Sequence, residues 1–365
     1  MLCSIRICEL MSTFLRAASL VVAAFALAFP ASSAGQAHAN KVALRDLVSP
    51  NDPLAQQDLV FDATFAQLTL QYFDSNDAAV FGTLAQSPAA AHLLEHARNF
   101  DYDVPKDSTR SLVAHLLRPS PQQSAEAKVC KGNLEYFTTQ MLADPHWVND
   151  TLRYLPDDFR FHGTLFLIFG YDIGVAFGPS ASLNCGHGHF AGHSNELLYY
   201  GIHELHHVGF MSYQPPPRLA DIKTCRDLLQ LVQYSSQLEG MAVLAAYQRR
   251  GEEHALADDE DYVALQDEAR MKRDEDLYFA DVRYLEERGD APADAEAWAV
   301  ISRMSSGERL WYRVGARMAQ RIEQAAGRRA LVALIKTGPA SFLEKYRLVA
   351  ALDAGVPTPK ERNTR

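Results

Sequence analysis

Apolar residues recur at helical spacing over most of the chain. Residues 59–73, 78–97 and 111–117 carry apolar side chains three and four positions apart, and prolines separate these segments. The pattern predicts a mostly helical N-terminal region over residues 40–160.

The pattern changes near residue 162. Two short apolar runs rich in β-forming residues, 164–169 and 173–177, are each followed by glycine. They predict two strands of a small antiparallel element, followed by a Gly/His-rich loop over residues 185–193.

Two long helices are expected after this loop. The first covers residues 195–210, with Ser194 as its N-cap, and the second covers residues 225–250, opened by Thr224 and closed by Gly251. Three further helices are expected over residues 310–326, 330–335 and 341–352. The predicted fold class is therefore mainly α with a small antiparallel β element (α+β).

An acidic run over residues 258–261 lies between these helices. Such runs are usually solvated, so it indicates an exposed face or a helix start rather than a metal site. The end of the chain, residues 353–365, is predicted to be a polar tail.

Residues 1–39 have the layout of a secretory signal peptide. Arg6 and Arg16 supply positive charge, residues 17–29 are continuously apolar, and a small-residue set ends at Ala39. This apolar run is too short to span a bilayer comfortably, and no other stretch is long enough. We expect an exported protein, periplasmic or secreted, with no membrane span after leader removal. An uncleaved N-terminal anchor is the alternative, and Met11 is an alternative start.

Composition narrows the classes of protein. The 365 residues are 48% hydrophobic and 22% charged, which is typical of globular proteins, and the length allows about two domains. Lys and Arg number 35 against 45 Asp and Glu, a net charge of −10, which argues against a nucleic-acid binder.

Three cysteines remain once the predicted leader is removed: Cys130, Cys185 and Cys225. In an oxidising compartment they allow one disulfide and leave one thiol. A pair of Cys185 with Cys225 would bracket the His-rich region, but spacing does not fix the pairing. Three buried thiols are an equal alternative.

The 13 histidines are unevenly distributed, with six of them between residues 187 and 207. His203, Glu204 and His207 satisfy the motif HExxH inside the helix expected over residues 195–210. Residues four apart share a helix face, so both imidazoles can bind one Zn²⁺ while Glu204 reaches a metal-activated water as general base. His206 points elsewhere on the helix, where a supporting or packing role is expected. The alternative is a helix that holds three histidines by chance.

Two histidines leave a zinc site one protein ligand short. Glu239 is the one acidic residue in an otherwise largely apolar stretch, residues 228–247, and such a carboxylate needs a partner. Gly240 beside it would let another backbone come close. We predict Glu239 as the third ligand; pairing with an arginine or a hydroxyl is the alternative.

These motifs resemble the gluzincin branch of zinc metallopeptidases, in which HExxH is followed by a Glu on the next major helix. The segment from Leu310 to Ala316 is also similar to the Tyr-x-x-Gly-Ala helix opening of aminopeptidase-N-like gluzincins. The resemblance covers residues 160–250 and 310–346, and it is strongest to poorly characterised bacterial zinc-dependent peptidases.

The resemblance implies a zincin-like catalytic domain over residues 161–352 that hydrolyses peptide bonds of a peptide or protein substrate. It implies that His203, His207 and Glu239 bind Zn²⁺, that Glu204 is the general base and that Tyr312 stabilises the oxyanion. For Tyr312 a buried aromatic with a hydrogen-bonded hydroxyl is the alternative.

Two departures from the family pattern limit the substrate prediction. The chain lacks the Gly-Ala-Met-Glu-Asn exopeptidase motif, so aminopeptidase specificity is not supported. Val243 stands where thermolysin-like enzymes carry an Asp behind the ligands.

Two neighbouring segments carry open hypotheses. Residues 164–177 resemble the antiparallel edge strand of this fold, which could pair with an extended peptide, or they form an ordinary core hairpin. His187, His189 and His193 could bind a second metal, contact substrate or cap the site, although loop histidines are usually just polar residues.

Two other functions compete with hydrolysis. One is a catalytically inactive zinc-binding relative that acts as a binding or chaperone-like protein, although the intact Glu204 argues against it. The other is a helical envelope-associated module in which the histidines are incidental.

Overall fold

The computed structural model describes residues 40–353, so the predicted leader and all but the first residue of the predicted tail lie outside the described residues. The N-terminal helices are α2 Thr64–Ser75, α3 Ala78–Ala85, α4 Pro88–Asn99, α5 Thr109–Leu116, α6 Gln123–Tyr136 and α7 Val148–Leu152. The later helices are α8 Glu196–Met211, α9 Cys225–Glu252, α10 Glu260–Gln266, α11 Glu268–Arg288, α12 Ala295–Ser302, α13 Leu310–Ala326, α14 Arg328–Thr337 and α15 Pro339–Asp353. None of these helices is long and apolar enough to cross a membrane.

One five-stranded sheet accompanies the helices. Its strands are β1 Lys41–Ala43, β2 Val60–Asp62, β3 Thr164–Ile168, β4 Gly174–Phe177 and β5 Ser180–Asn184. The spatial order is β1-β2-β3-β5-β4. The pairs β2–β3 and β3–β5 are parallel, whereas β1–β2 and β4–β5 are antiparallel.

The mainly α prediction with a small β element is confirmed, but a purely antiparallel element is wrong because the sheet is mixed. The two expected strands do not pair with each other, since β5 inserts between β3 and β4. β1 and β2 come from the region predicted to be mostly helical, so the sheet joins strands from both sides of residue 160.

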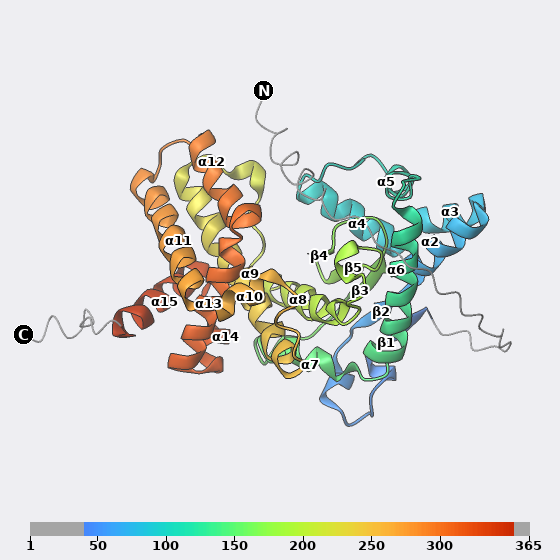
Figure 1. The fold of residues 1–365 in the computed structure, drawn as a ribbon, viewed down its shortest axis with the longest axis horizontal. Coiled ribbons are helices and arrows are strands. Elements are labelled where there is room, and N and C mark those ends of the chain that lie inside the picture. Colours follow the sequence, from blue (N-terminus) through green and yellow to red (C-terminus); the bar gives the residue numbers. More distant parts are fainter. Residues whose placement is uncertain (1–39, 354–365) are drawn as a thin grey trace, which may run out of the picture.

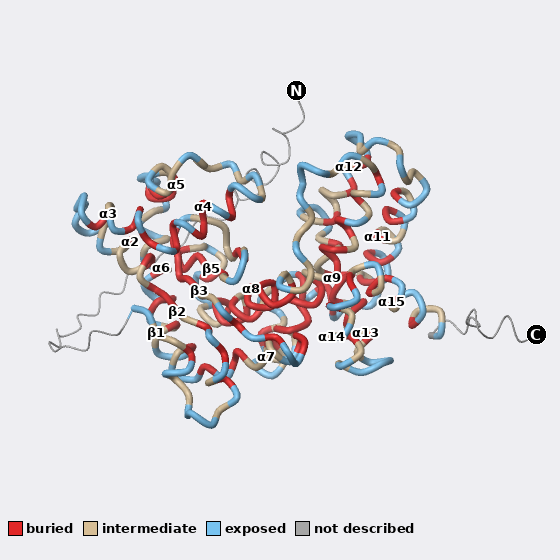
Figure 2. Tube along the Cα trace, turned by 180° about the vertical axis from the view of Figure 1, so that it is seen from behind, coloured by how far each residue is buried: buried red, intermediate tan, exposed pale blue. Residues whose placement is uncertain are grey.

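The molecule has a sheet-containing part and a helical part (Figure 1). The sheet and α2–α6 lie on one side, α11–α15 on the other, and α8 runs between them. Buried residues concentrate along α8 and α9 (Figure 2), and α13 packs against α9.

Helices α8 and α9 pack antiparallel. Near the end of α8 the Phe210 ring lies 5.6 Å from the Tyr234 ring, between centroids. At its start the Glu196 carboxylate accepts two hydrogen bonds of 2.6 Å from the Arg250 guanidinium, with both side chains 1% exposed. Contacts at both ends fix the relative positions of the residues between them.

The bounds of these helices agree with the predictions to within two residues, but two of the predicted end residues are wrong. Thr224 caps α9 in a reciprocal capping box with Asp227, and α13 has the predicted bounds. Ser194 does not cap α8, which is preceded by Asn195 with no side-chain cap bond. Gly251 does not close α9, which continues to Glu252.

The cysteine pairing left open by the sequence is Cys130 with Cys185, which links α6 to the residue after β5. Cys225 is free and buried. The alternative pair of Cys185 with Cys225 is therefore not formed.

Helices α9 and α13 cross at two glycines. A Cβ built on Gly240 would lie 2.2 Å from the carbonyl carbon of Gly315, and one on Gly315 would lie 2.3 Å from the Ser236 carbonyl oxygen. Both distances are far inside van der Waals contact, so only glycine fits at either position. The close backbone approach expected at Gly240 is confirmed.

Replacing Gly240 with alanine is expected to destabilise the protein by roughly 3 kcal/mol, because the new methyl group meets backbone that cannot rotate away. Urea denaturation followed by circular dichroism measures this. Gly132→Ala is the matched control: Gly132 is exposed in α6 with nothing within 4 Å of a built Cβ. It should be neutral or stabilise by about 0.5–1 kcal/mol. Equal stability of the two variants would contradict the packing argument.

Candidate metal centre and active-site cleft

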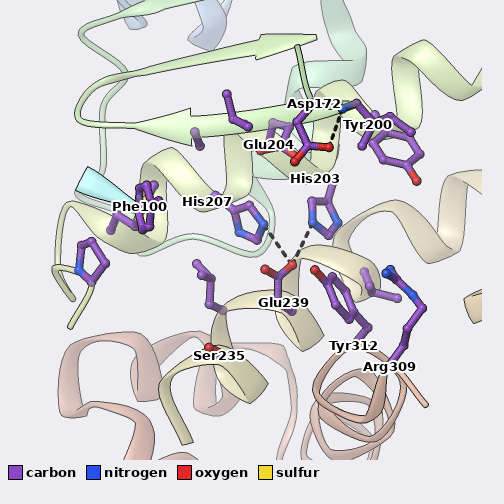
Figure 3. A pocket seen from close by; sticks show the side chains of 18 of the residues that line it. Phe100, Asp172, Tyr200, His203, Glu204, His207, Ser235, Glu239, Arg309 and Tyr312 are labelled. Carbon is purple, nitrogen blue, oxygen red and sulfur yellow. Dashed lines mark hydrogen bonds and ion pairs between the residues drawn. The ribbon is translucent and has the colours of Figure 1, made fainter. Parts of the chain in front are cut away.

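The candidate ligands meet where α8 faces α9. His203 and His207 lie one helical turn apart, with ring centroids separated by 4.4 Å. The Glu239 Oε2 atom lies 3.1 Å from the Nε2 atom of each histidine (Figure 3). The structure thus brings together three side chains that are 36 residues apart in sequence at their widest.

This donor set fits a zinc ion. Tetrahedral zinc with bonds of about 2.0–2.2 Å keeps neighbouring ligand atoms roughly 3.3 Å apart, close to the 3.1 Å seen here. Two imidazoles and one carboxylate form a common catalytic donor set, and it leaves a fourth position open.

The protonation states of Glu239 and His203 also suit a cation. Burial alone would raise the pKa of Glu239, but the charge and hydrogen bonds of His207 and His203 outweigh burial and hold this pKa well below its ordinary value. Burial lowers the pKa of His203. In His207 the Glu239 carboxylate outweighs burial and raises the pKa. The centre therefore offers an ionised carboxylate and a neutral His203 imidazole.

Glu204 lies next to His203 on α8, and its carboxylate is within 4.8 Å of the histidine nitrogens. Burial raises the pKa of Glu204 to about 8, with Glu239 and Asp172 adding to the effect and His207 opposing it. The β4 backbone covers this carboxylate: a Cβ built on Gly174 would lie 2.7 Å from Glu204 Oε1. Gly174 therefore allows the edge strand to lie directly against Glu204.

Tyr312 lies in the first turn of α13, and its side chain points toward Glu239 in the cleft (Figure 3). Burial raises the pKa of Tyr312, and the Glu239 charge adds to this, so the hydroxyl keeps its proton. The Arg309 guanidinium lies 3.9 Å from the Tyr312 ring centroid. The ring is thus held from the side away from Glu239 by a cation–π contact.

Asp261 anchors this arginine. Its Oδ2 atom accepts hydrogen bonds of 2.9 and 2.7 Å from Arg309, and its Oδ1 atom accepts one of 2.8 Å from Arg313. Arg309 has a left-handed backbone at φ 53°, which costs energy outside glycine. The acidic run is a helix start, as predicted, because Asp259 caps α10. A solvated face is wrong for Asp261, which is buried.

The loop histidines do not line the cleft. The His187 Nδ1 atom accepts a hydrogen bond from the His189 backbone N–H, and His189 Nε2 lies 3.1 Å from Glu196 Oε2. The Arg250 guanidinium already donates hydrogen bonds to the Glu196 carboxylate and supplies the positive charge that balances it. His206 is buried and lies 3.3 Å from the Tyr154 carbonyl oxygen, away from the centre, as expected.

A cleft of about 410 Å³ surrounds the candidate metal centre. Its wall includes residues that the sequence did not single out: His96 and Phe100 from α4 and its C-cap, Tyr102 after it, and Asp172 before β4. The spacing of these four residues forms no motif that would indicate a functional site, and they lie in segments that the sequence predicts to be ordinary helix or loop. Val243, at the position where thermolysin-like enzymes carry an Asp behind the ligands, also lines the cleft.

Residues 134–355, more than half of the chain, match the family described as "Putative zinc dependent peptidase (DUF5700)". The chain belongs to this family. No curated protein and no solved structure matches the chain. The matched region contains every candidate ligand together with Glu204 and Tyr312, and it begins after Phe100.

Zinc is expected to bind at one equivalent and to raise the melting temperature, since a ligand held only by the native state stabilises it by about 2.7 kcal/mol at a hundredfold excess over Kd. Isothermal calorimetry on chelator-treated protein measures the stoichiometry, and calorimetric melting measures the stabilisation. His203→Ala and Glu239→Ala should remove both effects. His162→Ala, an exposed histidine outside the cleft, serves as control. Unchanged zinc binding in Glu239→Ala would exclude Glu239 as a ligand.

Proposed function

We propose that the chain is an exported zinc-dependent metallopeptidase of the gluzincin type. His203, His207 and Glu239 hold Zn²⁺, Glu204 is the general base and the Tyr312 hydroxyl stabilises the oxyanion. The observation that carries the proposal is the convergence of Glu239 Oε2 on both imidazoles at 3.1 Å, with Glu204 on the same helix.

Zn²⁺ bound to these residues would act as a Lewis acid and lower the pKa of water. Glu204 then accepts the proton of the attacking water and returns it to the amine that leaves. A positioned carboxyl group can act in both steps, first as the base and then as the acid. The packing of α8 against α9 on one side and β4 on the other keeps much of its surface away from water, which strengthens these interactions.

Tyr312 supplies a hydrogen-bond donor to the tetrahedral oxyanion. Its hydroxyl stays protonated, and a donor fixed in advance where negative charge develops lowers the barrier. Arg309 holds the ring so that no reorganisation is needed during the reaction.

The substrate peptide is proposed to extend along β4. Within residues 40–353 this strand is at the edge of the sheet and pairs with β5 alone, and it contributes Gly174, Val175 and Ala176 to the cleft wall. An exposed edge can pair with an extended peptide through main-chain hydrogen bonds. Export is supported by the signal-like residues 1–39 and by the disulfide of Cys130 with Cys185, since disulfides persist in oxidising compartments.

Glu204→Gln is expected to lower kcat by roughly 10²–10⁴ because the amide cannot accept the proton, while zinc stoichiometry stays at one. Cleavage of a mixed peptide library, followed by mass spectrometry, measures the activity. Glu95→Gln, an exposed site on α4, is the matched control. Full activity of Glu204→Gln would refute the proposed base. A zinc-loaded wild type that cleaves no peptide would leave the non-catalytic zinc-binding alternative.

Tyr312→Phe is expected to lower kcat by about 10²–10³ with little change in KM, because the lost hydrogen bond forms only as charge develops. Steady-state kinetics on one cleaved peptide separates the two parameters. Tyr213→Phe removes a hydroxyl that bonds Asp158 outside the cleft and should leave both unchanged. A rise in KM alone would mean that Tyr312 binds the ground state instead.

A further inference from the structure

The metal centre divides the cleft into two halves of different chemistry. Because α8 and α9 are antiparallel, the end of α8 faces the first half of α9, and the start of α8 faces its last turns. We call the first part the apolar half, lined by Phe100, Met211, Leu219, Leu231 and Leu238. The other part is the charged half, lined by Arg250, Asp259, Asp261 and Arg309. Figure 3 shows Phe100 on the His207 side of the centre and Arg309 on the opposite side.

The charged lining residue Asp172 lies on the His203 side of the centre (Figure 3), where it accepts a hydrogen bond from Tyr102. The residues of the apolar half that can titrate are Tyr234, which donates a hydrogen bond to the Gln214 carbonyl oxygen, and His96, which burial keeps neutral by lowering its pKa to about 3. A charged group of the substrate would find no counterion in this half and would lose its hydration there.

Part of this apolar surface faces water. Leu219 is 41% exposed, one of four large apolar residues classed as exposed among residues 40–353, and Phe100, Met211 and Leu238 are half-buried. Apolar surface left open beside a reaction centre gains free energy when another apolar group covers it. The occupant that this half fits is therefore an apolar side chain.

The Phe100 ring forms part of the cleft wall, and neighbouring rings fix its position. Its ring lies 4.7 Å from the His96 ring and 6.2 Å from the Phe177 ring, between centroids, so it is fixed between α4 and the end of β4. An aromatic ring that is already ordered can bind without a large loss of side-chain entropy.

We propose that the apolar half is a substrate pocket for one large aliphatic or aromatic side chain beside the cleaved bond, with Phe100 and Leu219 as its specificity-determining residues. The proposal rests on the proposed peptidase function. Of these two residues, Phe100 lies upstream of residues 134–355, the region that matches the family, and Leu219 lies inside it.

The test compares peptides that differ at one position flanking the cleaved bond, carrying Phe, Leu, Ala, Lys or Glu. Zinc-loaded full-length protein should cleave the Phe and Leu peptides with the highest kcat/KM. Phe100→Ala should reduce kcat/KM for the Phe peptide about tenfold and for the Ala peptide less than about twofold. Leu219→Asp should raise the relative rate of the Lys peptide, because the new carboxylate can pair with the ammonium group.

A second measurement does not need turnover. Fluorescence anisotropy follows binding of the same labelled peptides to the Glu204→Gln protein, with and without Phe100→Ala. Leu348→Asp is the control for Leu219→Asp, since Leu348 is 39% exposed on α15, outside the cleft.

The outcomes separate the two proposals. Cleavage without preference for large apolar residues, or an equal loss for all peptides in Phe100→Ala, overturns the pocket and leaves the peptidase. Selective binding of the Phe and Leu peptides without any cleavage by the wild type supports the pocket and overturns the peptidase.

Discussion

Placing the ionised carboxylate of Glu239 on an apolar helix costs free energy unless opposite charge and hydrogen bonds compensate it. Two imidazoles on α8 provide that compensation, and a divalent cation among the three groups would complete it. The arrangement requires α8 and α9 to keep one register. The buried pair of Glu196 and Arg250 at one end and the packed rings of Phe210 and Tyr234 at the other maintain it.

The turn of α9 that carries Glu239 also positions the third helix. Gly240 follows Glu239 directly, and its missing side chain lets the α13 backbone approach at Gly315. Tyr312 comes three residues before Gly315, so the same crossing brings its hydroxyl to the side of the cleft that Glu239 occupies. A larger residue at the crossing would separate a candidate ligand from a candidate oxyanion donor. Geometry at the centre thus depends on backbone contact more than on long side chains.

Local patterns predicted local features well. The capping box at Thr224 and the bounds of α13 are confirmed, because each depends on residues within a few positions. The close approach at Gly240 is also confirmed, although its partner Gly315 lies on another helix. The mixed sheet was not predictable in this way. β1 and β2 have three residues each, too few to show an alternating pattern of apolar and polar residues. The insertion of β5 between β3 and β4 depends on which strands pair in space, and the residue pattern of a single strand does not specify its neighbours.

The same reasoning explains the other differences. The pairing of Cys130 with Cys185 and the burial of Asp261 beside two arginines depend on residues about 50 positions away. The wall at Phe100 depends on a similar long-range contact, in which α4 packs on the segment before β4. There the His96 Nδ1 atom and the Tyr171 hydroxyl lie 3.1 Å apart, and the Tyr102 hydroxyl donates to Asp172. The residues proposed for the chemistry lie within 134–355, whereas Phe100 and the rest of α4 lie upstream of that region. Substitutions in α4 and the loop after it can therefore alter which side chain fits the cleft while leaving Glu239 and its two histidines in place, so selectivity can vary independently of the metal centre.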